Sequence, residues 1–547
     1  AVQAAELALP LSLADVGSVL GLERQKMTEG KELIKYFCVP CKPTKSNGNR
    51  TRNRPCHDIN KWETFKKYCM RDVDVERQIA DKLKMYPISD EEHRLYVLDQ
   101  IINDRGVLVD SELAEQAVKL NSIQTAVAVE QAYMITGLEN PNSVTQLKQW
   151  LKEKGVEIES LSKKSVKSLA DETDGDVSEM LKLRLLMAKT SVKKYEAVIR
   201  SVCSDNRVHG MMRFCGANRT GRWSGNILQP QNLPQNHLPD LTLARDIVKD
   251  GDFEMLDMMF GNVPNVLSEL IRTILIPKPN HRFIVADFSA IEARVLAWIA
   301  GEQWRIDTFK NGGDIYCASA SKMFKVPVEK HGVNGELRQK GKISELACGY
   351  GGSVGALKNM GAVEMGVQEN ELQGLINDWR NANPHIVRFW YEVGNAAMKA
   401  IKEKTTVPLG KLVFAYERGI LFIRLPSGRR LSYIKPRIGT NRFGGDSITY
   451  MGINSAKKWD RLETFGGKLT ENIVQGTARD LLANALINAA NAGYDTVFHV
   501  HDEIICEVPN GYGSVDELCK LMCIKPEWAD GLPLNADGFE CEYYKKE

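Results

Sequence analysis

Two adjacent carboxylates, Asp502 and Glu503, stand between two short apolar runs. Residues 497–508 are rich in β-branched side chains on both sides of His501-Asp502-Glu503, which predicts a strand, a tight turn and a second strand. Adjacent carboxylates repel each other, so they are favourable where a cation sits beside them. The pattern predicts a metal site at the tip of a hairpin, with an ordinary solvated turn as the alternative.

A third carboxylate, Asp287, follows the buried run 283–286. Apolar residues then recur every three or four positions, at Ile291, Val295, Trp298 and Ile299. This spacing predicts a helix after the strand, and the junction would expose Asp287 as a second metal ligand. Ser289 and Glu292 have the spacing of a capping box, which is the structural alternative for Glu292.

Four side chains between residues 338 and 351 are spaced four apart, namely Arg338, Lys342, Leu346 and Tyr350. On a helix they would share one face. Two cations one turn apart suit a triphosphate, and an aromatic ring beyond them suits a base. A solvated basic helix face is the alternative. A dinucleotide-binding loop is not predicted, because Val354 occupies the position of its third glycine.

These three motifs, in this order, resemble those of family A DNA polymerases, and the resemblance covers the chain from about residue 90 to its end. Residues 287–292 look like the first palm motif, residues 338–351 like the fingers helix and residues 501–503 like the second palm motif. Residues 425–429 and 538–544 are most similar to bacteriophage members.

Further segments resemble the DNA contacts of this family. Residues 220–224 with 231–234 are similar to its primer-template contact segment, and residues 471–480 to its palm helix with a minor-groove glutamine. Turns and helix surfaces are the alternatives. The resemblance implies that five residues contact primer-template DNA, namely Arg222, Gln231, Asn232, Gln475 and His501.

The resemblance implies template-directed DNA synthesis by two-metal-ion nucleotidyl transfer. Asp287, Asp502 and the backbone carbonyl of Phe288 would hold two Mg²⁺ ions, for which Mn²⁺ could substitute. Glu503 and Lys342 would assist catalysis. The incoming dNTP would be bound by Arg338, Lys342, Leu346, Tyr350, Glu292 and Tyr316.

Two positions depart from the usual family pattern. Many members carry a histidine where Tyr316 follows Asp314-Ile315. A phenol has no positive charge at neutral pH, so phosphate binding should depend more on the two fingers cations. Leu346 replaces the usual Phe or Tyr and has no polar atom, which predicts strong discrimination against dideoxynucleotides. Packing on the buried flank of the helix is the alternative for Leu346.

Residues 61–82 resemble the last motif of a proofreading 3′–5′ exonuclease, and Tyr68 and Asp72 match its Tyr-x-x-x-Asp. Such sites hold two metals with carboxylates from several segments. The expected Asp-x-Glu strand does not precede this motif, and Asp252-Phe253-Glu254 lies inside the polymerase region. We therefore expect no exonuclease activity from this chain.

The resemblance implies an α+β fold shaped as a right hand, with an antiparallel palm sheet and helical fingers and thumb. The predicted boundaries are 1–87 for the C-terminal part of an exonuclease-like domain, 88–204 for the thumb, 205–300 and 431–547 for the palm, and 301–430 for the fingers.

The net charge of +2 over 547 residues provides no global basic field. DNA binding should then depend on local patches. One is the run Lys42, Lys45, Arg50, Arg52 and Arg54, expected to be a flexible loop, with a plain solvated loop as the alternative.

The 12 cysteines show no regular framework, which indicates reduced thiols in a cytoplasm, that of the host if the protein is phage-encoded. Cys38 and Cys41 form a Cys-x-x-Cys, but Cys56-His57 lacks the spacing of a second zinc-ligand pair. No apolar run reaches membrane-spanning length, so no membrane partner is expected.

Two other functions fit some of these motifs. A single-subunit RNA polymerase shares the Asp, the Arg/Lys/Tyr helix and the His-Asp, but Glu292 and the exonuclease-like segment argue against it. A DNA-binding relic without catalysis would not need Asp287, Asp502, Arg338 and Lys342 intact. The expected partners are primer-template DNA and dNTPs, with a replicative helicase or primase as candidates, and the expected state is a monomer.

Overall fold

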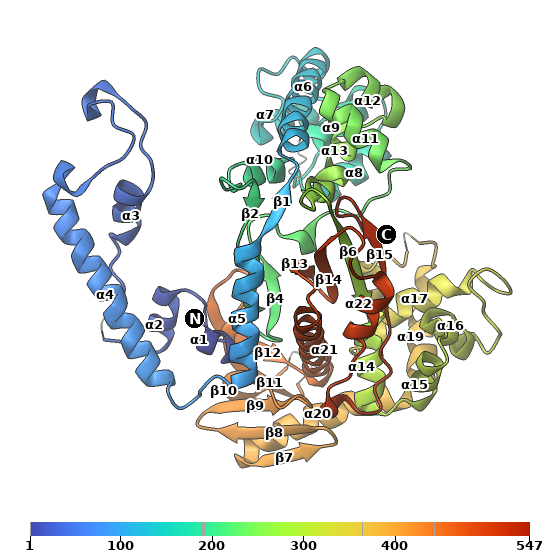
Figure 1. Ribbon diagram of the computed structural model, residues 1–547. Coiled ribbons are helices and arrows are strands. Elements are labelled where there is room, and N and C mark those ends of the chain that lie inside the picture. Colours follow the sequence, from blue (N-terminus) through green and yellow to red (C-terminus); the bar gives the residue numbers. More distant parts are fainter. Residues whose placement is uncertain (1, 24, 188–191, 364, 442–443, 547) are drawn as a thin grey trace.

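The computed structural model describes residues 2–23, 25–187, 192–363, 365–441 and 444–546 (Figure 1). Helices predominate, and neighbouring strands of each sheet pair antiparallel, which confirms the predicted α+β class. Helical lobes lie above and to the right of a central sheet, and an arm extends on the left (Figure 1). Within the described residues, no helix is long and apolar enough to cross a membrane.

The central sheet has four strands in the order β13-β14-β6-β15. Their bounds are Thr496–Val500 for β13, Glu503–Pro509 for β14, His281–Phe288 for β6 and Ala536–Cys541 for β15. Helix α22 (Val515–Met522) packs on β6 and β15, while α5 (Asp90–Arg105) and α21 (Gly466–Asn491) pack on β13. Both faces of the sheet are therefore covered.

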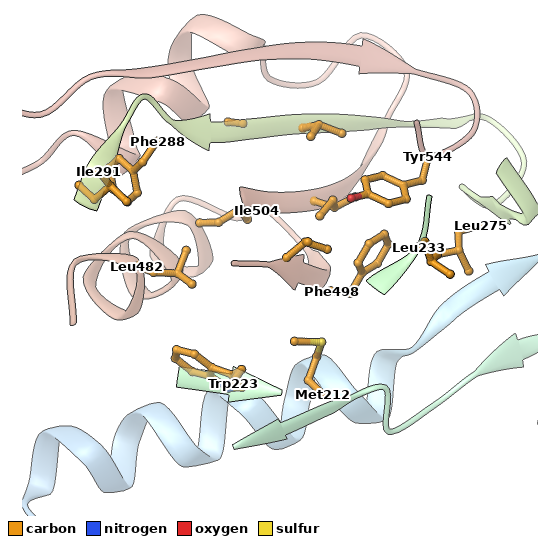
Figure 2. Close-up of a cluster of buried hydrophobic side chains, with 14 of the residues drawn as sticks. Met212, Trp223, Leu233, Leu275, Phe288, Ile291, Leu482, Phe498, Ile504 and Tyr544 are labelled. Atoms are coloured by element: carbon orange, nitrogen blue, oxygen red, sulfur yellow. The ribbon is translucent and has the colours of Figure 1, made fainter. Parts of the chain in front are cut away.

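The sequence of β6 explains its central place. Phe283, Ile284, Val285 and Ala286 are all buried, as expected for a continuous apolar run in a strand with helices on both faces. Side chains of the neighbouring elements complete this core, and Figure 2 shows Phe498 beside Tyr544, with Trp223 and Met212 nearer to α5. The sheet is thus a rigid support for the polar groups at its end.

The upper lobe in Figure 1 is organised by α6 (Ser111–Thr136). The chain enters and leaves it through a small sheet of β2 (Arg207–Val208), β1 (Val107–Val109) and β5 (Leu275–Ile276). A separate apolar core lies at its tip. The other helices of the lobe are α7 (Val144–Glu153), α8 (Lys163–Glu172), α9 (Gly175–Met187), α10 (Lys193–Ile199), α11 (Leu241–Asp250), α12 (Phe253–Phe260) and α13 (Val263–Leu270).

The packing of this lobe differs from the predicted boundary between thumb and palm at residues 204/205. Helices α11 and α13 pack on α6, although the sequence placed residues 241–270 in the palm. Conversely, α5 packs on β13 and α21 rather than on the lobe. We therefore propose that the thumb comprises residues 111–199 and 241–270, because α9, α10, α11 and α13 all pack on α6.

The helices after β6 are α14 (Ile291–Ala300), α15 (Gln303–Lys310), α16 (Ile315–Phe324), α17 (Leu337–Cys348), α18 (Val354–Asn359), α19 (Leu372–Ala382) and α20 (Pro384–Glu403). Of these, α15, α16, α17 and α19 form the lobe on the right of Figure 1, whereas α14 and α20 lie below the central sheet. Helices α16 and α17 pack closely on each other, and α19 packs on both. Pro384 stands at the first position of α20, where its missing N–H has no helical partner to lose.

A six-stranded sheet follows this lobe, in the order β12-β11-β10-β9-β8-β7. This sheet crosses the predicted boundary between fingers and palm at residues 430/431, because Leu431 of β10 pairs with Ile423 of β9. A division near residue 405 fits the pairing better. The strands are β7 (Thr406–Leu409), β8 (Leu412–Glu417), β9 (Ile420–Arg424), β10 (Arg430–Thr440), β11 (Asp446–Ile453) and β12 (Trp459–Thr464).

The first 87 residues form the arm on the left of Figure 1. Its helices are α1 (Val2–Glu6), α2 (Leu13–Val19), α3 (Gly30–Cys38) and α4 (Ile59–Leu83). The base of the arm is fixed to the body, since Ser432 Oγ donates a hydrogen bond to the Glu6 carbonyl at 3.1 Å. Farther out, Leu33, Phe37 and Tyr68 form a small apolar cluster of their own.

Candidate active site

The predicted hairpin is confirmed, with β13 and β14 joined by the turn His501-Asp502. His501 adopts the left-handed conformation, with φ of 57°, which histidine tolerates better than most residues. This conformation closes the turn within two residues. Glu503 is the first residue of β14 and is buried, whereas Asp502 is half-buried. The two adjacent carboxylates therefore lie in different environments.

Strand register places further carboxylates beside this turn. Asp287, the penultimate residue of β6, pairs with Glu503 on β14 and with Asp537 on β15. Directly paired residues project from the same face of a sheet, so these three side chains are neighbours. The backbone N–H of Phe288 also donates to the Asp502 carbonyl at 3.3 Å. Asp287 thus forms one acidic cluster with Asp502, Glu503 and Asp537, which are more than 200 positions away in the sequence.

The acidic cluster is electrostatically unfavourable without a cation. Burial raises the pKa of Asp287, and the charges of Asp502 and Glu503 raise it further. Burial also raises the pKa of Asp502 and that of Glu503, against the opposing charge of Lys546. In addition, Asp287 Oδ1 is buried and has no hydrogen-bond partner among the described residues. These features fit a site that binds a metal ion.

Other carboxylates of the cluster are already engaged by the protein. Glu503 accepts a hydrogen bond from the Tyr544 hydroxyl at 2.7 Å, and Lys546 Nζ lies 3.6 Å from its carboxylate. Asp537 accepts a hydrogen bond from Ser289 Oγ. Asp287 and Asp502 are therefore the available ligands, and no group of three potential His, Cys, Asp or Glu ligands occurs in the described ranges. Mg²⁺ can bind at a site with only two protein carboxylates, because it keeps waters and substrate oxygens as its other ligands.

The capping box, which was the structural alternative for Glu292, does not form. The residue that caps α14 is Ala290, with φ of 49° and no side-chain cap, because Ser289 binds Asp537 instead. Glu292 accepts a hydrogen bond from Arg222 Nη2 at 2.7 Å and another from the Tyr350 hydroxyl at 2.8 Å. It therefore joins the strand that begins at Arg222, helix α14 and the residue two positions beyond the end of α17.

The helix predicted from the spacing of Arg338, Lys342 and Leu346 is confirmed as α17, which ends at Cys348, so Tyr350 lies just beyond it. Lys342 is exposed, and no ion pair is recorded for it with another described residue. Leu346 is 52% exposed, which rules out the alternative that it packs in the core. Both side chains are thus accessible to a ligand on this face.

Arg338, the first cation of α17, is held by a residue that the sequence analysis did not assign to the site. Its guanidinium contacts Asp314 at 2.7 and 2.9 Å and lies 5.2 Å from the Tyr316 ring. Burial alone would raise the pKa of Asp314, but hydrogen bonds from Arg338 and the start of α16 lower it. Asp314 and Tyr316 thus orient Arg338.

The five predicted DNA contacts lie on several elements. Arg222 begins β4 (Arg222–Gly225), which pairs with β3 (Met212–Ala217). Gln231 and Asn232 lie in a 3-10 turn, η3 (Pro230–Asn232), and the Gln231 Oε1 atom is buried without a partner in the described structure. Gln475 is half-buried on α21, and His501 is exposed.

Three residues near the acidic cluster escaped the sequence analysis, namely Asp537, Tyr544 and Lys546. Tyr544 ends the segment 538–544 that resembles bacteriophage members. Its side chain is fully buried and accepts a hydrogen bond from Arg272 at 3.1 Å. Lys546 lies 3.9 Å from Asp287. No local sequence pattern predicts such contacts, because they join residues that are far apart in the sequence and meet only in the folded chain.

Within the part of the chain that the structure describes, the exonuclease-like motif forms no comparable cluster. Asp72 pairs with Lys26 at 3.2 Å, and Tyr68 stacks on Phe65 within the small core of the arm. Cys38 and Cys41 are free thiols. The motif residues therefore contribute to packing and charge pairing in this part of the chain.

Comparison with known proteins matches residues 111–523 to the family described as DNA polymerase family A. The chain is 52% identical to the DNA polymerase of Bacillus phage SP02, over 100% of this chain and 85% of that protein. It is 27% identical to the thermostable DNA polymerase I of Thermus aquaticus, over 47% of this chain and 27% of that protein.

A solved structure has a similar fold. It is the POL domain of Pol1 from M. smegmatis in complex with DNA primer-template and dNTP, with a TM-score of 0.62 and 20% identity. The alignment covers 99% of this chain and 81% of that one.

Proposed function

Because the chain belongs to DNA polymerase family A, we propose that its acidic cluster is the catalytic centre for adding deoxynucleotides to a primer 3′ end. The chain is a DNA-directed DNA polymerase that copies a template. One observation carries the assignment of the site. Asp287 pairs with Glu503, the residue that follows Asp502 in the turn, and the buried Oδ1 atom of Asp287 has no hydrogen-bond partner among the described residues.

Family A DNA polymerases depend on divalent metal ions. We assign two Mg²⁺ ions, replaceable by Mn²⁺, to Asp287, Asp502 and the backbone carbonyl of Phe288. When bound, the ions lower the pKa of the primer hydroxyl and neutralise the leaving pyrophosphate. Glu503 lies behind these ligands and, through Tyr544, fixes the strand that carries the turn.

The fingers face would hold the incoming nucleotide. Arg338 and Lys342 would bind the triphosphate, with Tyr316 orienting Arg338 but adding no positive charge. Leu346 would lie against the sugar. Tyr350 and Glu292 are joined by a hydrogen bond, and this pair would exclude a 2′-hydroxyl by occupying its space.

The primer-template would contact Arg222, Gln231, Asn232, Gln475 and His501. Minor-groove acceptors are shared by correct base pairs, so such contacts can test pair geometry without reading sequence. Arg222 binds Glu292 at 2.7 Å, which connects the primer terminus to the sugar site. We also propose a monomer in the host cytoplasm, with a helicase or primase as candidate partners, to be examined by light scattering and co-purification.

Primer extension with metal-ligand variants tests this function. Asp287→Ala and Asp502→Ala should abolish extension while primer-template still binds, because a metal ligand matters more to the chemical step than to DNA affinity. Asp537→Ala is the matched control. Its carboxylate lies on the same sheet face but is held by Ser289 and is not an assigned metal ligand, so this variant should retain activity. Extension within tenfold of the parent in either ligand variant would contradict the assignment.

The same assay separates the two alternatives. An RNA polymerase would prefer rNTPs to dNTPs on the same template, and a relic without catalysis would extend neither. Preference for dNTPs by the parent is the expected result, because the hydrogen-bonded pair Glu292–Tyr350 leaves no polar partner free for an extra hydroxyl.

A further inference from the structure

A strongly basic stretch of the chain lies on the arm, far along the sequence from the proposed catalytic centre. Residues 31–71 contain 11 Lys or Arg and 3 Asp or Glu, a net charge of +8, although the whole chain carries only +2. The rest of the chain is therefore net acidic. Such an asymmetry predicts a surface for a polyanion.

The centre of this charge is the loop 39–58 between α3 and α4, which we name the basic loop. Contrary to the flexible loop expected from the sequence, hydrogen bonds hold it. The Cys41 N–H donates to the Thr51 carbonyl at 2.8 Å, and Asn53 Nδ2 donates to the Tyr36 carbonyl at 3.0 Å. Asn47 Nδ2 donates to the Lys42 carbonyl at 2.8 Å. A held backbone loses less freedom when it binds a ligand.

Four cations of the basic loop are exposed, namely Lys42, Lys45, Arg52 and Arg54. Among the described residues, no ion pair with a carboxylate is recorded for any of these four side chains. Nearby cations differ, because Lys61 pairs with Asp58 at 3.0 Å and Lys66 pairs with Glu63 at 2.7 Å. The loop thus presents unneutralised charge, whereas these two lysines of α4 are paired with carboxylates.

The composition of the basic loop indicates which polyanion it binds. Residues 40–57 contain no Leu, Ile, Val, Met, Phe, Tyr or Trp. Protein interfaces usually need an apolar or aromatic anchor, whereas nucleic-acid surfaces are dominated by Lys and Arg with small polar residues. Two arginines can also bind phosphate oxygens in bidentate fashion. An acidic protein is therefore the less favoured ligand.

We propose that the basic loop binds the phosphodiester backbone of DNA at a second surface, separate from the proposed catalytic centre. In Figure 1 the arm extends from the side of the body that carries α5, whereas α17 lies on the opposite side. A contact there would hold DNA that has not yet reached the proposed catalytic centre or has already left it. Single-stranded and duplex DNA share this phosphate chemistry.

Fluorescence anisotropy without nucleotide tests the proposal independently of catalysis. The probes are a labelled 30-nucleotide single strand and the matching blunt duplex. The variant combines Lys42→Gln, Lys45→Gln, Arg52→Gln and Arg54→Gln. The expected result is at least a tenfold loss of affinity at low salt, with the slope of log K against log salt reduced by about 3 to 4. The probe that loses more identifies the form of DNA that is bound.

A control variant changes the same charge elsewhere, by Lys399→Gln, Lys404→Gln, Lys457→Gln and Lys458→Gln. These exposed lysines lie on α20, at its C-terminal cap and in the turn between β11 and β12. Affinity of the loop variant within twofold of this control would overturn the proposal. So would tighter binding of a polyglutamate peptide than of either DNA probe. Both variants should melt at the parent temperature, because exposed cations contribute little to stability.

Discussion

Replacing Asp287 by asparagine should stabilise the protein in the absence of metal, although it should abolish synthesis. Asp287 lies beside Asp502 and Glu503 at the end of the central sheet, and burial and these charges raise its pKa. A folded-state pKa above the unfolded value near 3.9 means that the folded state binds the proton more tightly. The ionised carboxylate therefore destabilises the fold, and asparagine removes that charge at constant size.

The sign of the pH dependence follows from this shift. The stabilising contribution of protonated Asp287 is complete below the unfolded pKa and is lost as pH rises through the folded pKa. The advantage of Asp287→Asn should therefore grow between pH 5 and pH 8. Each unit of pKa shift corresponds to about 1.4 kcal/mol. The Asp287 side chain is 41% exposed, so water screens the repulsion, and we expect about 1–2 kcal/mol at pH 8.

Thermal unfolding in EDTA, at pH 5 and pH 8, measures this effect. A gain of about 1–2 kcal/mol corresponds to a rise of about 2–8 °C for a cooperative unit of 150–250 residues. Mg²⁺ should stabilise the parent at pH 8 but not the variant. The control Asp537→Asn should not gain stability, because its carboxylate already accepts a hydrogen bond from Ser289. A destabilised Asp287→Asn protein, or a gain that does not change with pH, would refute the reasoning.

Three more predictions follow from contacts outside the acidic cluster. Glu292→Ala should raise ribonucleotide use by several powers of ten. Glu292→Gln should change it less, because glutamine keeps the side-chain volume and an acceptor for the Tyr350 hydroxyl. Competition of rNTP against dNTP in single turnovers measures both effects. Leu346→Tyr should weaken the discrimination against ddNTP without loss of stability, because Leu346 is 52% exposed, and an unchanged ddNTP/dNTP ratio would contradict its place at the sugar. The parent should not excise a mismatched 3′ end, because Asp72 pairs with Lys26 and lies in no group of three potential metal ligands within the described residues; excision that Asp72→Ala removes would show otherwise.

The sequence by itself determined the local elements that carry the chemistry. The apolar run before Asp287, the β-branched runs around His501 and the four-residue spacing from Arg338 to Leu346 each identify a strand, a hairpin or a helix. Such patterns depend on periodicity within a few residues, which the chain encodes locally. The order of these motifs was sufficient for the family resemblance and for the predicted activity.

Only the tertiary structure decided which distant groups meet at the site. Arg222 and Glu292 are 70 positions apart, Tyr350 and Glu292 are 58 apart, and Ser289 and Asp537 are 248 apart. The last of these contacts explains why the capping box does not form, because the Ser289 hydroxyl that would accept the local hydrogen bond is held by a distant carboxylate. The six-stranded sheet likewise crossed a predicted boundary because strand pairing, unlike helix periodicity, joins residues whose separation no local pattern specifies.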